Sequence, residues 1–253
     1  MCDSTLAVIS DIHGNRWALE AILQDIECRK IRHVVNLGDC VYGPLDPSGT
    51  ATILMDLDIL TVRGNEDRIL FEPFGDSERS PSLNYTRESL RPEQLQWLKL
   101  LEKTTTAYEN FLLCHGTPER DDAYLLQEVS EQGITVRTAG EVEERVREVT
   151  QPAVLCGHDH IPRTVNLLDG RIVVNPGSVG LPAYRDDRPY FHVMETGTPH
   201  ARYSLVKRVE AAWRVENIAV SYAWETAAEV ARENGRPDWA DWLKTGRAML
   251  PHP

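Results

Sequence analysis

Aspartate and histidine residues at short spacings give this sequence its clearest chemical signal. Asp11 and His13 are two residues apart and follow the apolar run 6–9. Along an extended chain, side chains at that spacing point the same way, so a carboxylate oxygen and an imidazole nitrogen can converge on one metal ion. On its own, an Asp-x-His pair in an acidic chain is more often a solvated turn than a pair of metal ligands. The pair becomes informative only together with similar residues elsewhere in the chain.

Four further apolar runs end in residues of the same kinds. They are Asp39 after the run 33–37, Asn65 after 59–62, His115 after 111–114, and His158 with His160 after 153–156. Taken singly, His115 is most simply a hydrogen-bonded core histidine, and Asp39 a helix cap or turn residue. Chance seldom places oxygen and imidazole donors beside glycine at every strand exit of one sheet. The whole set therefore favours a metal site.

The segments between these runs must position the candidate ligands. Residues 16–30 lack Gly and Pro and carry apolar residues at helical spacing, which predicts a helix with Asn15 as its N-cap. Further helices are predicted near 51–57, 92–101 and 138–150. Strands that alternate with helices pair in parallel, and ligands gather at the carboxyl ends of such strands. We therefore expect the five apolar runs to form one sheet, with the candidate ligands along one edge.

The last third of the sequence changes its period. An Asp-Gly turn joins the stretches 163–168 and 171–174, which predicts a β-hairpin. Strands near 190–194, 201–206 and 213–218 then predict a second, antiparallel-rich sheet.

Two helices, 222–234 and 237–245, are predicted to close the chain. The second places Trp239, Trp242 and Leu243 on one face, as expected of a core helix or of a contact between copies of the chain. We expect a single domain over 1–253, with 220–253 as a C-terminal helical extension. The loop-like segments 68–91 and 118–132 follow ligand-bearing strands, so we expect both to border the mouth of the site and set substrate choice.

The composition limits the class of protein. With 42% hydrophobic and 26% charged residues, and no run near the ~20 apolar residues that span a bilayer, we expect a soluble globular protein without a membrane partner. The start lacks a secretory signal and the five cysteines show no C-x-x-C spacing, so we expect a cytoplasmic location. The net charge of −12 argues against a long nucleic acid as partner. A small anionic substrate would need local positive charge, which bound metal ions supply.

The order of these motifs resembles the calcineurin-like metallophosphoesterase superfamily. The residues that carry the resemblance are Asp11-x-His13, Gly38-Asp39, Gly64-Asn65-x-Asp67, His115-Gly116-Thr117-Pro118 and Gly157-His158-x-His160. Tyr42-Gly43-Pro44 and the segment 175–180 are similar to the branch of small bacterial and archaeal predicted phosphodiesterases. The resemblance implies an α/β fold, a four-layer α/β/β/α sandwich of two mixed sheets flanked by helices. That fold agrees with the two sheets and the helices expected from the periodicity.

The same resemblance implies the site. One metal ion would be held by Asp11, His13 and His160, the other by Asn65, His115 and His158, and Asp39 would bridge both. The implied cofactors are two divalent transition-metal ions, because imidazole ligands favour Mn, Fe, Zn, Co or Ni over Mg or Ca. Such a pair clamps the phosphoryl oxygens and supplies a hydroxide for in-line attack. No organic cofactor is expected. Residues 175–178 lack the composition of a phosphate-binding loop, so we expect them to form a tight turn packed beneath the ligand loops.

Residue 66 departs from the family pattern and completes the implied catalytic set with Asp39 and Asn65. Many members carry there a histidine that protonates the leaving oxygen, whereas this chain has Glu66. We expect that carboxylate to be ionised beside two cations and to repel a dianionic monoester more than a monoanionic diester. Small phosphodiesters are therefore the expected substrates. A phosphomonoesterase, a dinucleoside polyphosphate hydrolase and a non-catalytic metal-binding scaffold are the alternatives, the last disfavoured because the ligand set is complete.

Overall fold

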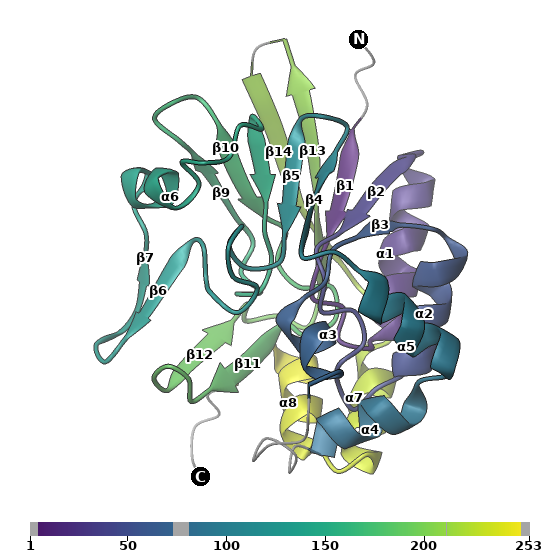
Figure 1. Cartoon of the computed structure of the whole chain (residues 1–253). Coiled ribbons are helices and arrows are strands. Elements are labelled where there is room, and N and C mark those ends of the chain that lie inside the picture. Colours follow the sequence, from purple (N-terminus) through teal and green to yellow (C-terminus); the bar gives the residue numbers. More distant parts are fainter. Residues whose placement is uncertain (1–4, 73–80, 211, 249–253) are drawn as a thin grey trace.

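The computed structural model describes residues 5–72, 81–210 and 212–248 (Figure 1). Its first sheet has the strand order β14-β13-β1-β2-β3. The bounds are β1 (Leu6–Ile9), β2 (His33–Asn36), β3 (Leu60–Thr61), β13 (Ala201–Val209) and β14 (Ala212–Val220). The strands β1, β2 and β3 are parallel, whereas β13 and β14 extend the sheet in antiparallel pairing. The first sheet is therefore mixed.

The second sheet has the order β4-β5-β8-β10-β9. Its strands are β4 (Thr104–Ala107), β5 (Phe111–Cys114), β8 (Ala153–Leu155), β9 (Arg163–Asn166) and β10 (Ile172–Asn175). The three central strands are parallel, and both edge strands are antiparallel to their neighbours. Two separate hairpins, β6 (Gln127–Ser130) with β7 (Gly133–Val136) and β11 (Ala183–Asp186) with β12 (His192–Glu195), complete the strands of the described residues.

Two predictions about strand pairing are wrong. The five ligand-bearing runs do not share one sheet, because the first three form β1, β2 and β3 of the first sheet and the last two form β5 and β8 of the second. The later strands do not build a sheet of their own, because β9 and β10 join the second sheet, and β13 and β14 join the first. Periodicity marks a residue run as a strand, but the choice of partner depends on contacts far apart in the sequence.

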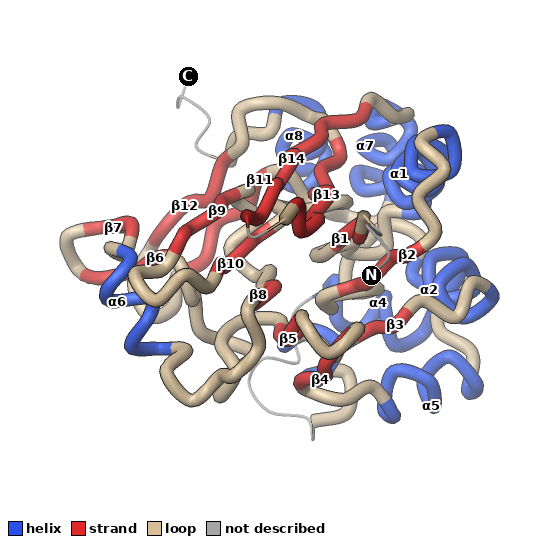
Figure 2. Tube along the Cα trace, turned by 90° about the horizontal axis from the view of Figure 1, so that it is seen from above, coloured by secondary structure: helices blue, strands red, loops and turns tan. Residues whose placement is uncertain are grey.

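Three hydrophobic clusters separate four layers (Figure 2). Ala7 and Ile9 of β1 pack towards the helices, whereas Leu6 and Val8 lie in the cluster between the two sheets. This alternation follows from the two-residue period of a strand. The third cluster joins the outer face of the second sheet to α6 (Ala139–Arg145) through residues such as Val142. The predicted arrangement of two mixed sheets flanked by helices is confirmed.

Most helices lie on the outer face of the first sheet (Figures 1 and 2). They are α1 (Arg16–Cys28), α2 (Pro47–Asp56), α4 (Pro81–Ser89), α5 (Pro92–Leu100), α7 (Trp224–Glu233) and α8 (Pro237–Thr245). Asn15 caps α1 as predicted, accepting a hydrogen bond from the Ala18 amide at 3.1 Å. The segment 68–91 was expected to be irregular, but it holds the end of α3 (Asn65–Ile69) and all of α4, while 73–80 lies outside the described residues. The described helices include none long and apolar enough to cross a membrane.

Candidate metal centre

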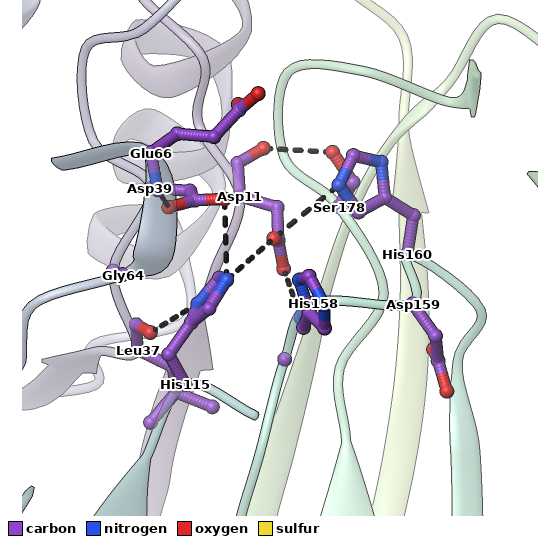
Figure 3. Close-up of polar contacts among 12 residues, drawn as sticks. Asp11, Leu37, Asp39, Gly64, Glu66, His115, His158, Asp159, His160 and Ser178 are labelled. Carbon is purple, nitrogen blue, oxygen red and sulfur yellow. Dashed lines mark hydrogen bonds and ion pairs between the residues drawn. The ribbon is translucent and has the colours of Figure 1, made fainter. Parts of the chain in front are cut away.

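The predicted ligands meet where strands of both sheets end, and Figure 3 shows five of them, Asp11, Asp39, His115, His158 and His160. Their backbone is unusual: the φ angles are 54° at Asp11, 53° at His13, 51° at Asp39, 72° at His158 and 60° at His160. Side-chain-bearing residues seldom adopt this left-handed region, because it brings Cβ close to the backbone. Such conformations cost about 1 kcal/mol or more each and cluster at functional sites. The fold therefore holds these loops in place at an energetic cost.

Backbone hydrogen bonds keep the first two ligand loops together. The Asp11 amide donates to the Gly38 carbonyl and the His13 amide to the Asp39 carbonyl, both at 3.0 Å. The Ser178 hydroxyl donates to the Asp11 carbonyl at 2.7 Å, so the turn at 175–178 packs against the same loop, as predicted. These bonds fix the direction in which Asp11 and Asp39 present their carboxylates.

Two glycines make room for those carboxylates. A Cβ at Gly64 would lie 2.0 Å from Asp39 Oδ1, and a Cβ at Gly157 would lie 2.1 Å from Ser10 Oγ and 2.8 Å from Asp11 Oδ2. Real Cβ atoms do not approach other heavy atoms so closely, so any side chain at either position would displace a candidate ligand. This packing explains why glycine accompanies the ligand residues in the sequence.

The side chains converge in two groups. Candidate ligand atoms of Asp11, His13 and His160 all lie within 4.8 Å of one another, as do those of Asp39, His115 and His158. In the first group, His160 Nε2 lies 3.1 Å from His13 Nε2 and 3.3 Å from Asp11 Oδ1. In the second, His115 Nε2 lies 3.1 Å from Asp39 Oδ2. A third group joins His13 and Asp39 to Glu66.

Three of the imidazole rings are held by backbone carbonyls. His115 Nδ1 lies 2.8 Å from the Leu37 carbonyl, His160 Nδ1 lies 2.7 Å from the Leu181 carbonyl, and His13 Nδ1 lies 3.2 Å from the Tyr42 carbonyl. A carbonyl can only accept, so each Nδ1 carries the proton and each Nε2 faces the site. A histidine that binds a metal is typically oriented in this way.

Several buried polar atoms at this place have no hydrogen-bond partner within the described residues. They are Asp11 Oδ1, Asn65 Oδ1 and His115 Nε2, of which the first and the last contact only other candidate ligands, as ion pairs with His160 and Asp39. Leaving a buried acceptor unpaired costs about 1–3 kcal/mol. Carboxylate, amide oxygen and imidazole nitrogen are all ligands of divalent transition metals. The donor set therefore fits a pair of such ions.

The pKa values indicate strong electrostatic attraction between the carboxylates and the imidazoles of the site. Burial raises the pKa of the Asp11 carboxyl, but the neighbouring His160 and other imidazoles outweigh it and hold that pKa well below its usual range. Burial lowers the pKa of His115, but Asp39 and Asp11 raise it overall to about 10. The pKa of His13 is likewise raised, to about 9, mainly through Glu66. Without bound ions, protonated imidazoles therefore balance the carboxylates.

Glu66 lies against a candidate ligand as well as the cavity. Its Oε2 is 3.1 Å from His13 Nδ1, and its amide donates to Asp39 Oδ1 at 2.9 Å. Without bound ions, burial raises the pKa of Glu66 to about 7, although His13 opposes the shift. Its ionisation beside two bound cations stays a prediction. The contact with His13 could not be read from the sequence, because the two residues lie on different loops.

The neighbouring acidic residues have structural roles. Asp67 accepts from the Cys40 amide at 2.9 Å and the Gly64 amide at 3.0 Å, so it fixes its loop. Asp159 points away from the two groups in Figure 3 and accepts from the Ile161 amide at 2.9 Å.

A cavity of about 290 Å³ opens beside the two groups. Besides candidate ligands and Glu66 it is lined by Tyr42, Tyr124, Leu181, Tyr184, Arg185, Asp186, Arg236, Trp239 and Trp242. Of the two segments expected at its mouth, 118–132 contributes Tyr124, whereas no described residue of 68–91 lines it. Sequence reasoning missed Tyr124, Tyr184 and Arg236. Arg185 is exposed and also lines the cavity.

The predicted aromatic stripe on α8 belongs to the core and reaches the site. Trp239 and Trp242 are 3% and 5% exposed and pack in the cluster that also contains α1. The edge of the Trp239 ring meets the His13 ring at 5.9 Å between centroids. The helical spacing indicated burial correctly, but it could not identify His13 as the neighbour.

Comparisons with known proteins agree with this geometry. The sequence model of the calcineurin-like phosphoesterase superfamily domain matches residues 5–198. An uncharacterised protein of Methanocaldococcus jannaschii is 27% identical, over 94% of this chain and 96% of its own. A metallophosphoesterase from Sphaerobacter thermophilus has a similar fold, with a TM-score of 0.74 at 23% identity, covering 96% of this chain and 99% of its own. A hypothetical protein from Pyrococcus horikoshii gives a TM-score of 0.75 at 21% identity, covering 97% and 100%. The chain belongs to the calcineurin-like phosphoesterase superfamily and is a metal-dependent phosphoric ester hydrolase.

Proposed function

We propose that this member of the superfamily hydrolyses small phosphodiesters at a pair of divalent transition-metal ions. Asp11, His13 and His160 would hold one ion, and Asn65, His115 and His158 the other, with Asp39 between them. The observation that carries the proposal is the convergence of the two buried groups, in which Asp11 Oδ1 and His115 Nε2 contact only other candidate ligands, beside the buried Asn65 Oδ1, which has no partner among the described residues. Protein interiors rarely leave such atoms unpaired without a bound group to satisfy them.

The residues of the chain prepare this site for phosphate chemistry. When bound, the two ions hold phosphoryl oxygens and lower the pKa of a shared water. Asp39 lies between the two groups, and its pKa is lowered because His115 and His13 outweigh the effect of burial, so the bridging carboxylate stays ionised. The backbone carbonyls that hold Nδ1 of three imidazoles would leave each Nε2 lone pair available to an ion once the ring is neutral. Preorganised ligands of this kind require little rearrangement during the reaction.

The preference for diesters rests on Glu66. Its side chain is 24% exposed and borders the cavity, so an ionised carboxylate would face the bound substrate. A phosphodiester carries one negative charge and a monoester carries up to two at neutral pH. The repulsion is therefore smaller for the diester.

The surroundings support the remaining parts of the proposal. Cys40, Cys114 and Cys156 are buried free thiols, as suits a reducing, cytoplasmic location. The helices α7 and α8 share a hydrophobic cluster with α1, which supports a single domain with a C-terminal helical extension. The mixture of imidazole and carboxylate donors supports Mn, Fe, Zn, Co or Ni as the bound metals.

The test combines metal analysis with matched substrates. Metal-free protein would be titrated with Mn²⁺, Zn²⁺ or Co²⁺, and assayed with bis(p-nitrophenyl) phosphate and p-nitrophenyl phosphate. We expect two ions per chain and faster hydrolysis of the diester. His33→Ala is the matched control for variants of the candidate histidine ligands, such as His158→Ala with His160→Ala. His33 lies at the other end of β2 from Asp39 and contacts Tyr108. Folded protein that binds no metal, or that hydrolyses only the monoester, would contradict the proposal.

A further inference from the structure

The hairpin of β11 and β12 stands apart from both main sheets and forms one wall of the cavity. It pairs only with itself among the described strands, yet three consecutive residues, Tyr184, Arg185 and Asp186, line the cavity. A segment of this kind is free to serve ligand recognition, because neither sheet depends on its pairing. The inference below rests on the proposed function.

The hairpin is anchored directly beside the candidate ligands. The Tyr124 hydroxyl lies 2.7 Å from the Tyr184 hydroxyl and 2.8 Å from His192 Nε2 on β12. The Tyr124 ring stacks on His158 at 4.6 Å, and the Tyr184 ring meets His160 edge-on at 4.6 Å. These contacts tie both strands to the site. The backbone of residue 185 is therefore held at a fixed place relative to the metal ligands.

Arg185 itself is uncommitted. It is exposed, and no described residue forms an ion pair or a hydrogen bond with its guanidinium group. The other arginine of the cavity, Arg236, is already engaged: its Nε and Nη2 donate to the Asp238 carboxylate at 2.9 and 2.8 Å, and its Nη1 contacts Ser82. Among the described cavity residues, Arg185 is thus the cation whose donors remain available.

The chemistry of a free arginine on this wall indicates what it binds. A guanidinium group presents five N–H donors in a planar fork that matches phosphate oxygens. The scissile phosphate belongs to the metal ions, whereas Arg185 stands on the hairpin wall, which carries none of the predicted ligands. The adjacent Asp186 does not neutralise it, because its Oδ1 accepts from the Arg188 amide at 3.0 Å and no ion pair with Arg185 forms.

We propose that Arg185 binds a second phosphate group, so that the preferred substrates are small phosphodiesters carrying an additional phosphate. The net charge of the chain is −12, so an extra anionic group needs a specific cation to be favourable. The cavity of about 290 Å³ lies just below the roughly 300–1,000 Å³ of small-molecule sites, which favours a small substrate.

The experiment compares two diesters with the same leaving group. One is thymidine 5′-(p-nitrophenyl phosphate), and the other is the same compound with a 3′-phosphate. For the compound with the 3′-phosphate, Arg185→Ala should raise KM about 10- to 100-fold and leave kcat little changed, while the simple diester is hydrolysed as before. Arg185→Lys should recover part of the loss. The matched control is Arg188→Ala, an exposed arginine of the same hairpin that does not line the cavity.

Each other result would overturn the inference. An equal loss with both substrates would place Arg185 at the scissile phosphate or in support of the hairpin. No loss with either substrate would exclude a substrate contact, and an equal loss in Arg188→Ala would indicate a general field effect. The proposed function is tested separately, by two bound ions and turnover of the simple diester in the unmodified protein. If those hold but the 3′-phosphate brings no advantage, only the role of Arg185 fails.

Discussion

Replacing Glu66 tests the link between this residue and substrate charge. Glu66→Gln removes the negative charge but keeps an oxygen that can accept from His13 Nδ1, now 3.1 Å from the carboxylate. Two unit charges ~6 Å apart interact by about 3 kcal/mol at an effective dielectric of ~20. A dianionic monoester differs from a diester by one charge. The ratio of monoester to diester kcat/KM should therefore rise by at most ~10²-fold in Glu66→Gln. The side chain is 24% exposed, and solvent screening reduces the expected gain towards tenfold.

The assay is the ratio of kcat/KM for p-nitrophenyl phosphate to that for bis(p-nitrophenyl) phosphate, measured from pH 5.5 to 9. Without ions the pKa of Glu66 is about 7, and bound cations move it lower. In the unmodified protein the ratio should fall as Glu66 ionises, over a range at or below pH 7. In Glu66→Gln it should be higher and lack this step. Glu66→His should further improve esters with poor leaving groups, because a positioned acid is typically worth 10²–10⁴.

The reasoning would be refuted by a ratio that does not move in Glu66→Gln while two ions stay bound. Metal content is the essential control, since Glu66 also contacts His13 and donates its amide to Asp39. An unmodified enzyme that prefers the monoester would equally refute it, because the preference for diesters has no other basis in the site.

Four further predictions concern the metal centre. His158→Ala combined with His160→Ala should abolish metal binding and activity while the circular dichroism spectrum stays native, because both residues lie in loops. Metal binding near pH 7 should release protons, because His115 and His13 have pKa values of about 10 and 9 without ions. The affinity for metal should therefore rise with pH up to that range. Calorimetry in two buffers would measure the number of protons released. The raised pKa values of His13 and His115 also stabilise the metal-free fold. This stabilisation is complete below 6.5, the ordinary pKa of histidine, and should be lost as pH rises through about 9 to 10. Gly64→Ala should lower metal occupancy because its Cβ would lie 2.0 Å from Asp39 Oδ1, whereas Gly140→Ala in α6, with nothing within 4 Å, should not.

Local sequence signals predicted the elements well where one short-range effect dominates. Pro237 at the first position and Gly246 with φ 64° just after the end delimit α8 as expected, because proline suits a helix start and glycine a left-handed cap. Asn15 likewise caps α1 through the Ala18 amide. Helix α6 ends at Arg145 instead of near residue 150, although Val146 and Val149 beyond its end still pack in the same hydrophobic cluster as Val142.

The candidate ligands could be identified because each follows a strand, but their surroundings could not. Tyr124 lies in a loop 60 residues before Tyr184, in the hairpin that also carries His192, and only the folded chain brings its hydroxyl within 2.8 Å of both. A tyrosine in a loop or an edge strand has no local feature that marks it as a neighbour of a metal ligand. Residue type therefore indicated the chemistry of the centre, whereas the walls of the cavity depended on non-local packing.

Each candidate group of metal ligands draws its members from both sheets. In the first candidate group, Asp11 and His13 follow β1 of the first sheet, whereas His160 follows β8 of the second. In the second group, Asp39 follows β2, whereas His115 and His158 follow β5 and β8. Neither sheet alone carries a complete group.

Since each group draws on both sheets, the distances between ligands are set by the hydrophobic cluster between them. Val8, Leu37, Leu113 and Leu155 of that cluster lie within a few residues of the ligand loops and are fully buried. Close packing makes such an interior resistant to small shifts. If every ligand followed strands of one sheet, the ligands would all approach the ions from the same side. The sandwich can therefore bring imidazole and carboxylate groups together from opposite sides, as a site that encloses two ions requires.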